Sequence, residues 1–178
     1  MNTVKITIIA TFCALSITSN YALVSVSNVK VMDLIVFVAG FLFGSVIGSS
    51  VGIFSWLIYG VLNPYGFVPQ IWLTTMLTES VYGITGGVLR KALGSTDLSS
   101  QRFRHSVLFA TMGFLPTVLY DTITNVVYAF SFQVPLVVAI FAGAPFTVLH
   151  EVVNAAFFGI CAVPIITMLG KIVKVNRI

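Results

Sequence analysis

The chain has 178 residues, of which 58% are hydrophobic and only 8% are charged. A soluble domain carries roughly 25% charged residues, so this composition excludes a soluble globular protein and indicates a membrane protein. The formal net charge of +4 does not indicate nucleic-acid binding, because the Lys and Arg residues cluster at the ends of apolar stretches. We therefore expect a single transmembrane domain over residues 1–178, with no soluble catalytic domain and no nucleic-acid partner.

The first apolar stretch, from about Val4 to Val24, is longer than the core of a typical signal peptide and is interrupted by polar residues. Because the residues around Ser19 to Ala22 also make a poor cleavage site, a retained first helix is favoured over a cleaved signal peptide. Within this helix, Ala10 and Ala14 form a pair of small residues on one face. Such a face either packs inside the bundle or receives a helix of another subunit.

The next two segments, about Val31 to Ile47 and Gly48 to Leu62, are joined so closely that they predict a helical hairpin or a broken helix. Glycines recur at every fourth residue along them, at Gly40, Gly44, Gly48 and Gly52. In the following segment, about Gln70 to Val88, Gly83 and Gly87 repeat this spacing. Small residues let membrane helices approach closely, so these glycines predict helix–helix contacts.

A polar link over residues 94–101 precedes the fifth segment, about Ser106 to Phe130. The last apolar stretch, from Val134 to Gly170, is too long for one untilted span. Pro135 and Pro145 both offer helix starts, since proline suits the first helical position. We expect the final helix to begin at Pro145, so that residues 131–144 form a short outer helix or a loop over the bundle.

The basic residues predict the orientation in the membrane. Cytoplasmic segments are enriched in Lys and Arg. With six helices and both termini in the cytoplasm, all but one of these residues lie inside, namely Lys5, Arg90, Lys91, Arg102, Arg104, Lys171, Lys174 and Arg177. Only Lys30 then lies outside. The sequence thus predicts an all-α, polytopic bundle of six transmembrane helices in the cell membrane.

Three acidic residues, Glu79, Asp121 and Glu151, lie deep in three different apolar segments, with no Lys or Arg near them in the sequence. A charge near the bilayer centre is costly, so it tends to face the bundle interior and to mark a functional site. Counting about 1.5 Å of rise per residue places all three in the outer half of the membrane. We expect them to line one polar pocket there.

Other polar and aromatic side chains share the helical faces of these acids. The predicted binding set on the helices is Glu79, Tyr82, Asp121, Asn125, Tyr128, His150, Glu151 and Asn154. The loop after the third segment and the edge of this loop are expected to supply lids over the pocket, namely Asn63, Tyr65 and Trp72. The alternative is that these groups only hydrogen-bond to one another and hold the helices together.

No nucleophile motif, zinc-ligand signature or phosphate-binding glycine loop is present, so an enzyme is not expected. Acid–base catalysis within the membrane by His150 and a carboxylate is the remaining enzymatic alternative. Cys13 and Cys161 both lie in apolar segments, where a thiol behaves as a small buried hydrophobe. Neither a metal site nor a cofactor is expected.

The chain resembles the S-component of energy-coupling factor (ECF) vitamin transporters in three features. These are six predicted helices in under 200 residues, the Ala10 to Ala14 segment, and the glycine-containing run from Asp33 to Gly52. The resemblance implies that the alanine pair docks onto a transmembrane coupling subunit driven by two ATPases. It also implies a vitamin site in the outer half of the membrane, among the last three helices and under outer loops. The whole subunit would rotate in the membrane to release the vitamin inside.

The expected function is therefore that of a membrane-embedded, high-affinity binding subunit for uptake of a vitamin-like small molecule. Carboxylates with aromatic neighbours suit a ligand with positive charge or many donors, such as a thiamine-like or other heterocyclic vitamin. Two other hypotheses stay open on the sequence. One is a stand-alone transporter coupled to protons or ions, and the other is a membrane scaffold that transports nothing.

Overall fold

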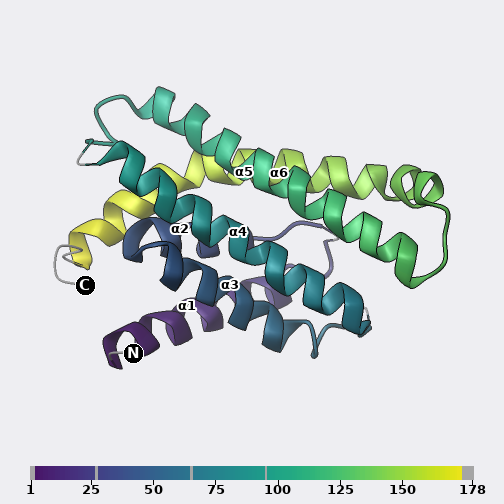
Figure 1. Cartoon of the computed structure of the whole chain (residues 1–178). Helices are drawn as coiled ribbons and strands as arrows, with labels where there is room; N and C mark the ends of the chain where they lie inside the picture. The colour runs from purple at the N-terminus through teal and green to yellow at the C-terminus, as the bar shows by residue number, and fades with distance from the viewer. Residues whose placement is uncertain (1–2, 27, 65, 95, 174–178) are drawn as a thin grey trace.

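The computed structural model describes residues 3–26, 28–64, 66–94 and 96–173, and these form six α-helices and no strands. In chain order the helices are α1 (Thr3–Ala22), α2 (Met32–Phe43), α3 (Ser45–Tyr59), α4 (Pro69–Leu93), α5 (Arg102–Ser131) and α6 (Leu136–Ile172). The two long helices α5 and α6 run antiparallel along one side, while α1 lies at the opposite side and packs mainly on α2 and α3 (Figure 1). The expected all-α class is confirmed.

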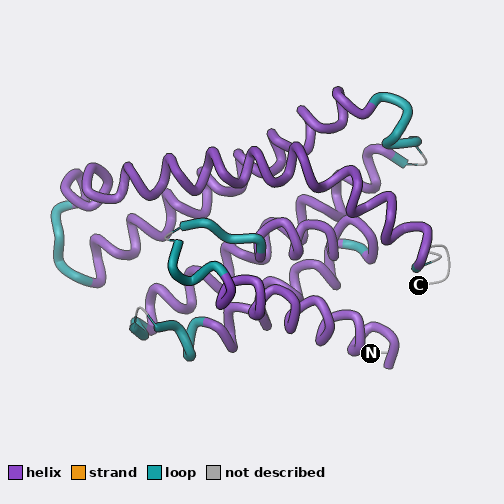
Figure 2. The backbone as a smooth tube through the Cα atoms, turned by 180° about the vertical axis from the view of Figure 1, so that it is seen from behind, coloured by secondary structure: helices purple, strands orange, loops and turns teal. Residues whose placement is uncertain are grey.

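The described ends of the chain lie at the same end of the bundle as the connection between α4 and α5 (Figure 1). We call this the terminal end. The opposite end, the loop end, holds the connections over residues 60–68 and 132–135. A further connection, over residues 23–31, leads from α1 to α2, and its described residues, 23–26 and 28–31, lie in the middle of the bundle (Figure 2).

The short helix α2 is the core of the molecule. Every residue from Met32 to Leu42 is buried. A helix that is apolar almost all round is expected to be surrounded by others, and α2 contacts α1, α3, α4 and α6. It ends at Gly44, whose φ of 95° favours glycine over residues with a side chain. The break between the second and third segments therefore falls at Gly44 rather than between Ile47 and Gly48.

Three helices meet through glycine backbones. A Cβ atom on Gly83 of α4 would overlap the backbone of Gly48 on α3, and one on Gly40 of α2 would overlap the backbone of Gly83. The predicted close contacts are confirmed at Gly40, Gly48, Gly52, Gly83 and Gly87. The prediction is wrong for Gly44, because a Cβ atom at this residue would have no neighbouring atom within 4 Å, and its role is the turn.

The last helix differs from the expectation. α6 is continuous over 37 residues from Leu136 and follows Pro135, with Pro145 inside it. The expected start at Pro145 is wrong, and residues 136–144 are the first turns of α6 rather than a separate element. An internal proline is tolerated where neighbouring helices, side chains or local adjustments satisfy the freed carbonyl. At 1.5 Å per residue α6 is about 55 Å long, well beyond the ~30 Å hydrocarbon core.

Among the described residues, three helices are both long and apolar enough to cross a bilayer, namely α1, α5 and α6. The helices α2 and α3 are also apolar but shorter, with 12 and 15 residues. At the loop end, α2 therefore leaves room that the connection over residues 23–31 occupies. That connection carries polar side chains into the bundle.

Candidate functional site

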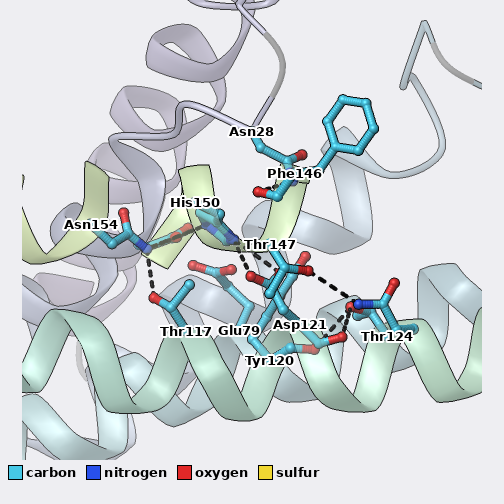
Figure 3. Close-up of polar contacts among 12 residues, drawn as sticks. Asn28, Glu79, Thr117, Tyr120, Asp121, Thr124, Phe146, Thr147, His150 and Asn154 are labelled. Carbon is cyan, nitrogen blue, oxygen red and sulfur yellow. Dashed lines mark hydrogen bonds and ion pairs between the residues drawn. The ribbon is translucent and has the colours of Figure 1, made fainter. Parts of the chain in front are cut away.

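A histidine joins three helices at the centre of the polar region. His150 on α6 contacts Asp33 on α2 through its Nε2 atom, at 2.8 Å from Oδ2. Its Nδ1 atom lies 3.0 Å from Oδ1 of Asp121 on α5. Figure 3 shows the side chains of Asn154, His150 and Asp121 in a row between α5 and α6. All four side chains are buried, with at most 6% of any of the residues exposed.

The geometry of this Asp33–His150–Asp121 triad fixes its proton content. A carboxylate has no donor, so each nitrogen–oxygen contact at about 3 Å needs one proton between its two atoms. Two carboxylates and one imidazole that share two bridging protons carry one net negative charge. A buried net charge is costly unless an opposite charge is near. Lys30 supplies such a charge, because it acts electrostatically on both Asp33 and His150.

Asn154 extends the triad to α4. Its Nδ2 atom donates to Asp33 Oδ2 at 2.6 Å and lies 2.8 Å from Thr117 Oγ1. The hydroxyl groups of Thr117 and Tyr82 are 2.7 Å apart. Both Thr117 and Tyr82 are completely buried. This cluster therefore ties α2, α4, α5 and α6 together through side chains from each.

Glu79 belongs to the same polar region but has a different partner. It is completely buried on α4, and its Oε2 atom accepts a hydrogen bond from Nε1 of Trp56 at 3.0 Å. Its other carboxyl oxygen has no hydrogen-bond partner among the described residues. Glu79 also acts electrostatically on Tyr82 and Tyr120, so it is part of the cluster rather than of a separate site.

A cavity of about 390 Å³ lies on the loop-end side of the triad. Ligand pockets typically measure about 300–1,000 Å³, so a small heterocycle fits. Asp121 lies both in the wall of this cavity and in the triad. The wall consists of Asn28, Lys30, Thr75, Tyr120, Asp121, Thr124, Asn125, Tyr128, Ala139, Ala142, Gly143, Phe146 and Thr147. The main cavity is thus bounded by α4, α5, α6 and the connection from α1 to α2.

Two side-chain contacts hold the wall of the main cavity. Asn28 donates from Nδ2 to the backbone oxygen of Phe146 at 3.0 Å, which ties the connection over residues 23–31 to α6 (Figure 3). Asn125 on α5 donates to Thr147 Oγ1 on α6 at 3.2 Å. Both contacts involve residues of the cavity wall. They join α6 to α5 and to the connection over the cavity.

Two smaller cavities adjoin the main one. One, of about 180 Å³, shares Asn28 and Lys30 with it and also contacts Asn63. The other, of about 250 Å³, shares Thr75 and Tyr128 with it and also contacts Trp72. All three cavities lie at the loop end. Together they form one polar and aromatic crevice. Lys30 lies between the main cavity and the first of the smaller ones, and Tyr128 lies between the main cavity and the second.

Toward the terminal end, the polar cluster is followed by aromatic side chains. The ring of Phe37 on α2 lies 5.7 Å from that of Phe109 on α5 and 5.1 Å from that of Phe158 on α6. Phe41, one turn further along α2, is 5.7 Å from Phe109. All four rings are buried, with at most 1% of each residue exposed. This apolar layer closes the polar region on the side of the terminal end.

The structure brings most of the predicted side chains together. Tyr82, Asp121, His150 and Asn154 lie in the buried cluster with Glu79 beside them, while Asn125 and Tyr128 line the main cavity. Asn63 and Trp72 line the smaller cavities. Glu151 is set apart, because it is only partly buried and is not in the wall of any of the three cavities. Tyr65 lies outside the described residues.

Sequence reasoning missed Asp33, Lys30 and Tyr120. Asp33 stands at the start of an apolar run, a position that indicates the boundary of a segment at the membrane surface. It is instead completely buried. One signal was available: Asp33, Phe37 and Phe41 follow each other at four-residue spacing, so they share one face of α2.

The fold and the crevice define a helical membrane protein with a ligand-sized polar cavity at one end. A family model described as "ECF-type riboflavin transporter, S component" matches residues 1–171, and the chain belongs to this family. The searches of curated proteins and of solved structures gave no match. The chain is therefore a multi-pass membrane protein that serves in vitamin uptake and is not an enzyme. S-components work with an ECF module of transmembrane and ATPase subunits.

Proposed function

We propose that this chain binds riboflavin in the main cavity and delivers it inward when it is docked on an ATP-driven module. The observation that carries the proposal is a cavity of about 390 Å³ lined by both aromatic and polar side chains, in a chain of the riboflavin S-component family. Tyr120, Tyr128 and Phe146 offer faces for a planar ring system. Asp121 and Asn125 offer hydrogen bonds to ring edges or to the hydroxyl groups of a sugar-alcohol chain.

The charge distribution favours a neutral heterocycle over a thiamine-like cation. The carboxylates of Asp33 and Asp121 are already paired with His150. The ammonium group of Lys30 also faces the cavity. Riboflavin is uncharged at neutral pH, and its ring and side chain carry many acceptors and donors. These match the hydroxyl, amide and ammonium groups of the wall.

We further propose six membrane-spanning segments with both termini in the cytoplasm and the cavity open to the outside. The support is the position of the basic residues: most of those described belong to helix ends at the terminal end, namely Lys5, Arg90, Lys91, Arg102, Arg104 and Lys171. Of the basic residues that the structure describes, Lys30 alone lies toward the loop end. Lys174 and Arg177, which were expected on the same side as the termini, lie outside the described residues.

For docking of the coupling subunit, we propose the apolar groove between α1 and α3. Ala10 and Ala14 are exposed and line a cavity of about 530 Å³ together with Phe54 and Ile58. Small residues in such a groove allow a partner helix to approach closely. Because the phenylalanine layer closes the polar region toward the terminal end, release to the inside requires movement of the whole subunit. The proposed docking supplies that movement.

The binding proposal is tested by titrating the purified protein with riboflavin and following the quenching of flavin fluorescence. We expect saturable binding to the wild type. Asp121→Ala removes a charged hydrogen-bonding group from the wall, so it should weaken binding by about 10- to 150-fold. Glu151→Gln serves as the control, because Glu151 is not in the wall of any of the three cavities. Equal affinity in both variants and the wild type would contradict the assignment of this cavity.

Uptake into vesicles separates the proposal from a stand-alone transporter. Vesicles that hold only this protein should show no riboflavin accumulation under a pH gradient, since the phenylalanine layer offers no polar path. Addition of the coupling subunit and its ATPases should produce ATP-dependent uptake. Accumulation without the module would support the proton- or ion-coupled alternative instead.

A further inference from the structure

Lys30 lies at the partition between two cavities and has an unusual environment. Its Nζ atom is 4.7 Å from the centre of the Tyr120 ring and 5.4 Å from that of Trp56. It lines the main cavity and the adjoining cavity of about 180 Å³. Within the described part of the chain, its ammonium group makes no hydrogen bond to an acceptor and no ion pair within 4.0 Å. Two aromatic faces therefore hold the cation.

This arrangement has the form of an aromatic cage. In proteins that recognise cationic ligands, such cages surround the ligand's positive charge with ring faces. Here the faces of Tyr120 and Trp56 are occupied by a cation of the chain itself. Tyr120 is also in the wall of the main cavity, so a cationic ligand would compete with Lys30 for the same ring.

We propose that Lys30 determines specificity: it fills the Tyr120–Trp56 cage with an internal cation, so that the site rejects cationic heterocycles and accepts neutral ones. This inference rests on the proposed function, since it assumes that the main cavity is the vitamin site. A ligand cation about 5 Å from Nζ, at an effective dielectric constant of about 20, would bind at least a hundredfold more weakly than its neutral counterpart. A neutral ring instead presents acceptor atoms that the ammonium group can donate to.

The net charge of the triad supports this role. The Asp33–His150–Asp121 triad carries one net negative charge, and the cation of Lys30 acts on it. With Lys30 in place, the triad does not act as a free anionic site for a cation from outside. Without it, the same carboxylates and the two ring faces would form the acidic, aromatic pocket that suits a cationic heterocycle.

The test compares three proteins, the wild type, Lys30→Gln and Lys30→Arg, with three probes by isothermal titration calorimetry. The probes are riboflavin, thiamine, and the neutral isostere of thiamine in which a carbon replaces the thiazolium nitrogen. Lys30→Gln keeps a long polar side chain but removes the charge, and Lys30→Arg keeps both the charge and the stacking on aromatic rings. Thermal unfolding of each variant in detergent checks that it is folded.

We expect the wild type and Lys30→Arg to prefer neutral probes. In Lys30→Gln, thiamine affinity should rise at least tenfold relative to its neutral isostere, and riboflavin should bind more weakly. An unchanged ratio of thiamine to isostere, or no thiamine binding to Lys30→Gln up to millimolar concentration, would overturn the inference. Failure of the wild type to bind riboflavin would instead reject the proposed function, and a gain of thiamine binding in Lys30→Gln would still support the role of Lys30.

Discussion

Replacement of Asp33 by Asn should destabilise the protein more than any other single carboxylate change near the cluster. Asp33 is completely buried and accepts from two groups on α6, His150 Nε2 at 2.8 Å and Asn154 Nδ2 at 2.6 Å. Asparagine keeps the shape but presents one uncharged acceptor. The imidazole of His150 then loses one of its two anionic partners, and the amide of Asn154 loses its charged acceptor.

The expected magnitude follows from the burial of both partners. Removal of one member of a buried ion pair costs about 3–5 kcal/mol, because the other charge stays in the protein without compensation. For a chain of this length, 1 kcal/mol corresponds to roughly 2–4 °C in Tm. Asp33→Asn should therefore lower Tm by about 6–20 °C. The loss should appear even without ligand, since the contacts are within the chain.

The measurement is thermal unfolding in detergent. Unfolding is monitored by circular dichroism, or by size-exclusion chromatography of heated samples. Glu151→Gln is the matched control: it is one residue from His150 on α6, yet it is only partly buried. Its Tm should change by less than about 2 °C, as for a substitution away from buried pairs. If both variants lose the same stability, the imidazole bridge is not what joins α2 to α5 and α6, and the reasoning on the triad is wrong.

Two further predictions concern the glycine contact and the loop over the cavity. Gly83→Ala should lower Tm, because the added Cβ meets the backbone of Gly48. An overpacking cost of about 1–3 kcal/mol corresponds to a loss of about 2–12 °C. The control Gly170→Ala has open space around its Cβ, so it should leave Tm unchanged or raise it slightly. Asn28→Gly keeps the positive φ of 56° but removes the bond to Phe146, so riboflavin release measured by stopped flow should accelerate by about 2- to 10-fold. Gln133→Gly, at a φ of 55° and outside the cavity wall, should leave the release rate as in the wild type, and equal rates in all three proteins would refute the role of the loop contact.

Much of the fold was predictable because its signals are local. Apolar segments and turn residues gave all six helices, and the four-residue glycine spacing gave the contact between α3 and α4. The errors arose where tertiary contacts override a local preference. Pro145 is a good helix start in isolation, yet α6 continues through it. Gly44 fits the spacing of a packing residue, yet its backbone conformation makes it a turn.

The site was only partly predictable, for a different reason. Asp121, His150 and Asn154 are deep in long apolar helices, so depth alone placed them together. The depth of Asp33 depends on the path of the chain before it. Because α2 begins only at Met32, after a connection whose described residues run into the bundle, Asp33 reaches the level of His150 instead of the membrane surface. A segment boundary drawn from hydropathy cannot show this.

The same shortness of α2 explains why a cavity exists at all. Twelve helical residues span about 18 Å, which is well short of the ~30 Å hydrocarbon core, so the turns that would fill the bundle at the loop end are missing. The connection over residues 23–31 takes their place, and it brings the polar side chains of Asn28 and Lys30 to the cavity wall. An irregular segment at membrane depth is tolerated only where protein or a water-filled cavity surrounds it. The crevice and the irregular segment therefore depend on each other, and lengthening α2 toward the loop end would remove both.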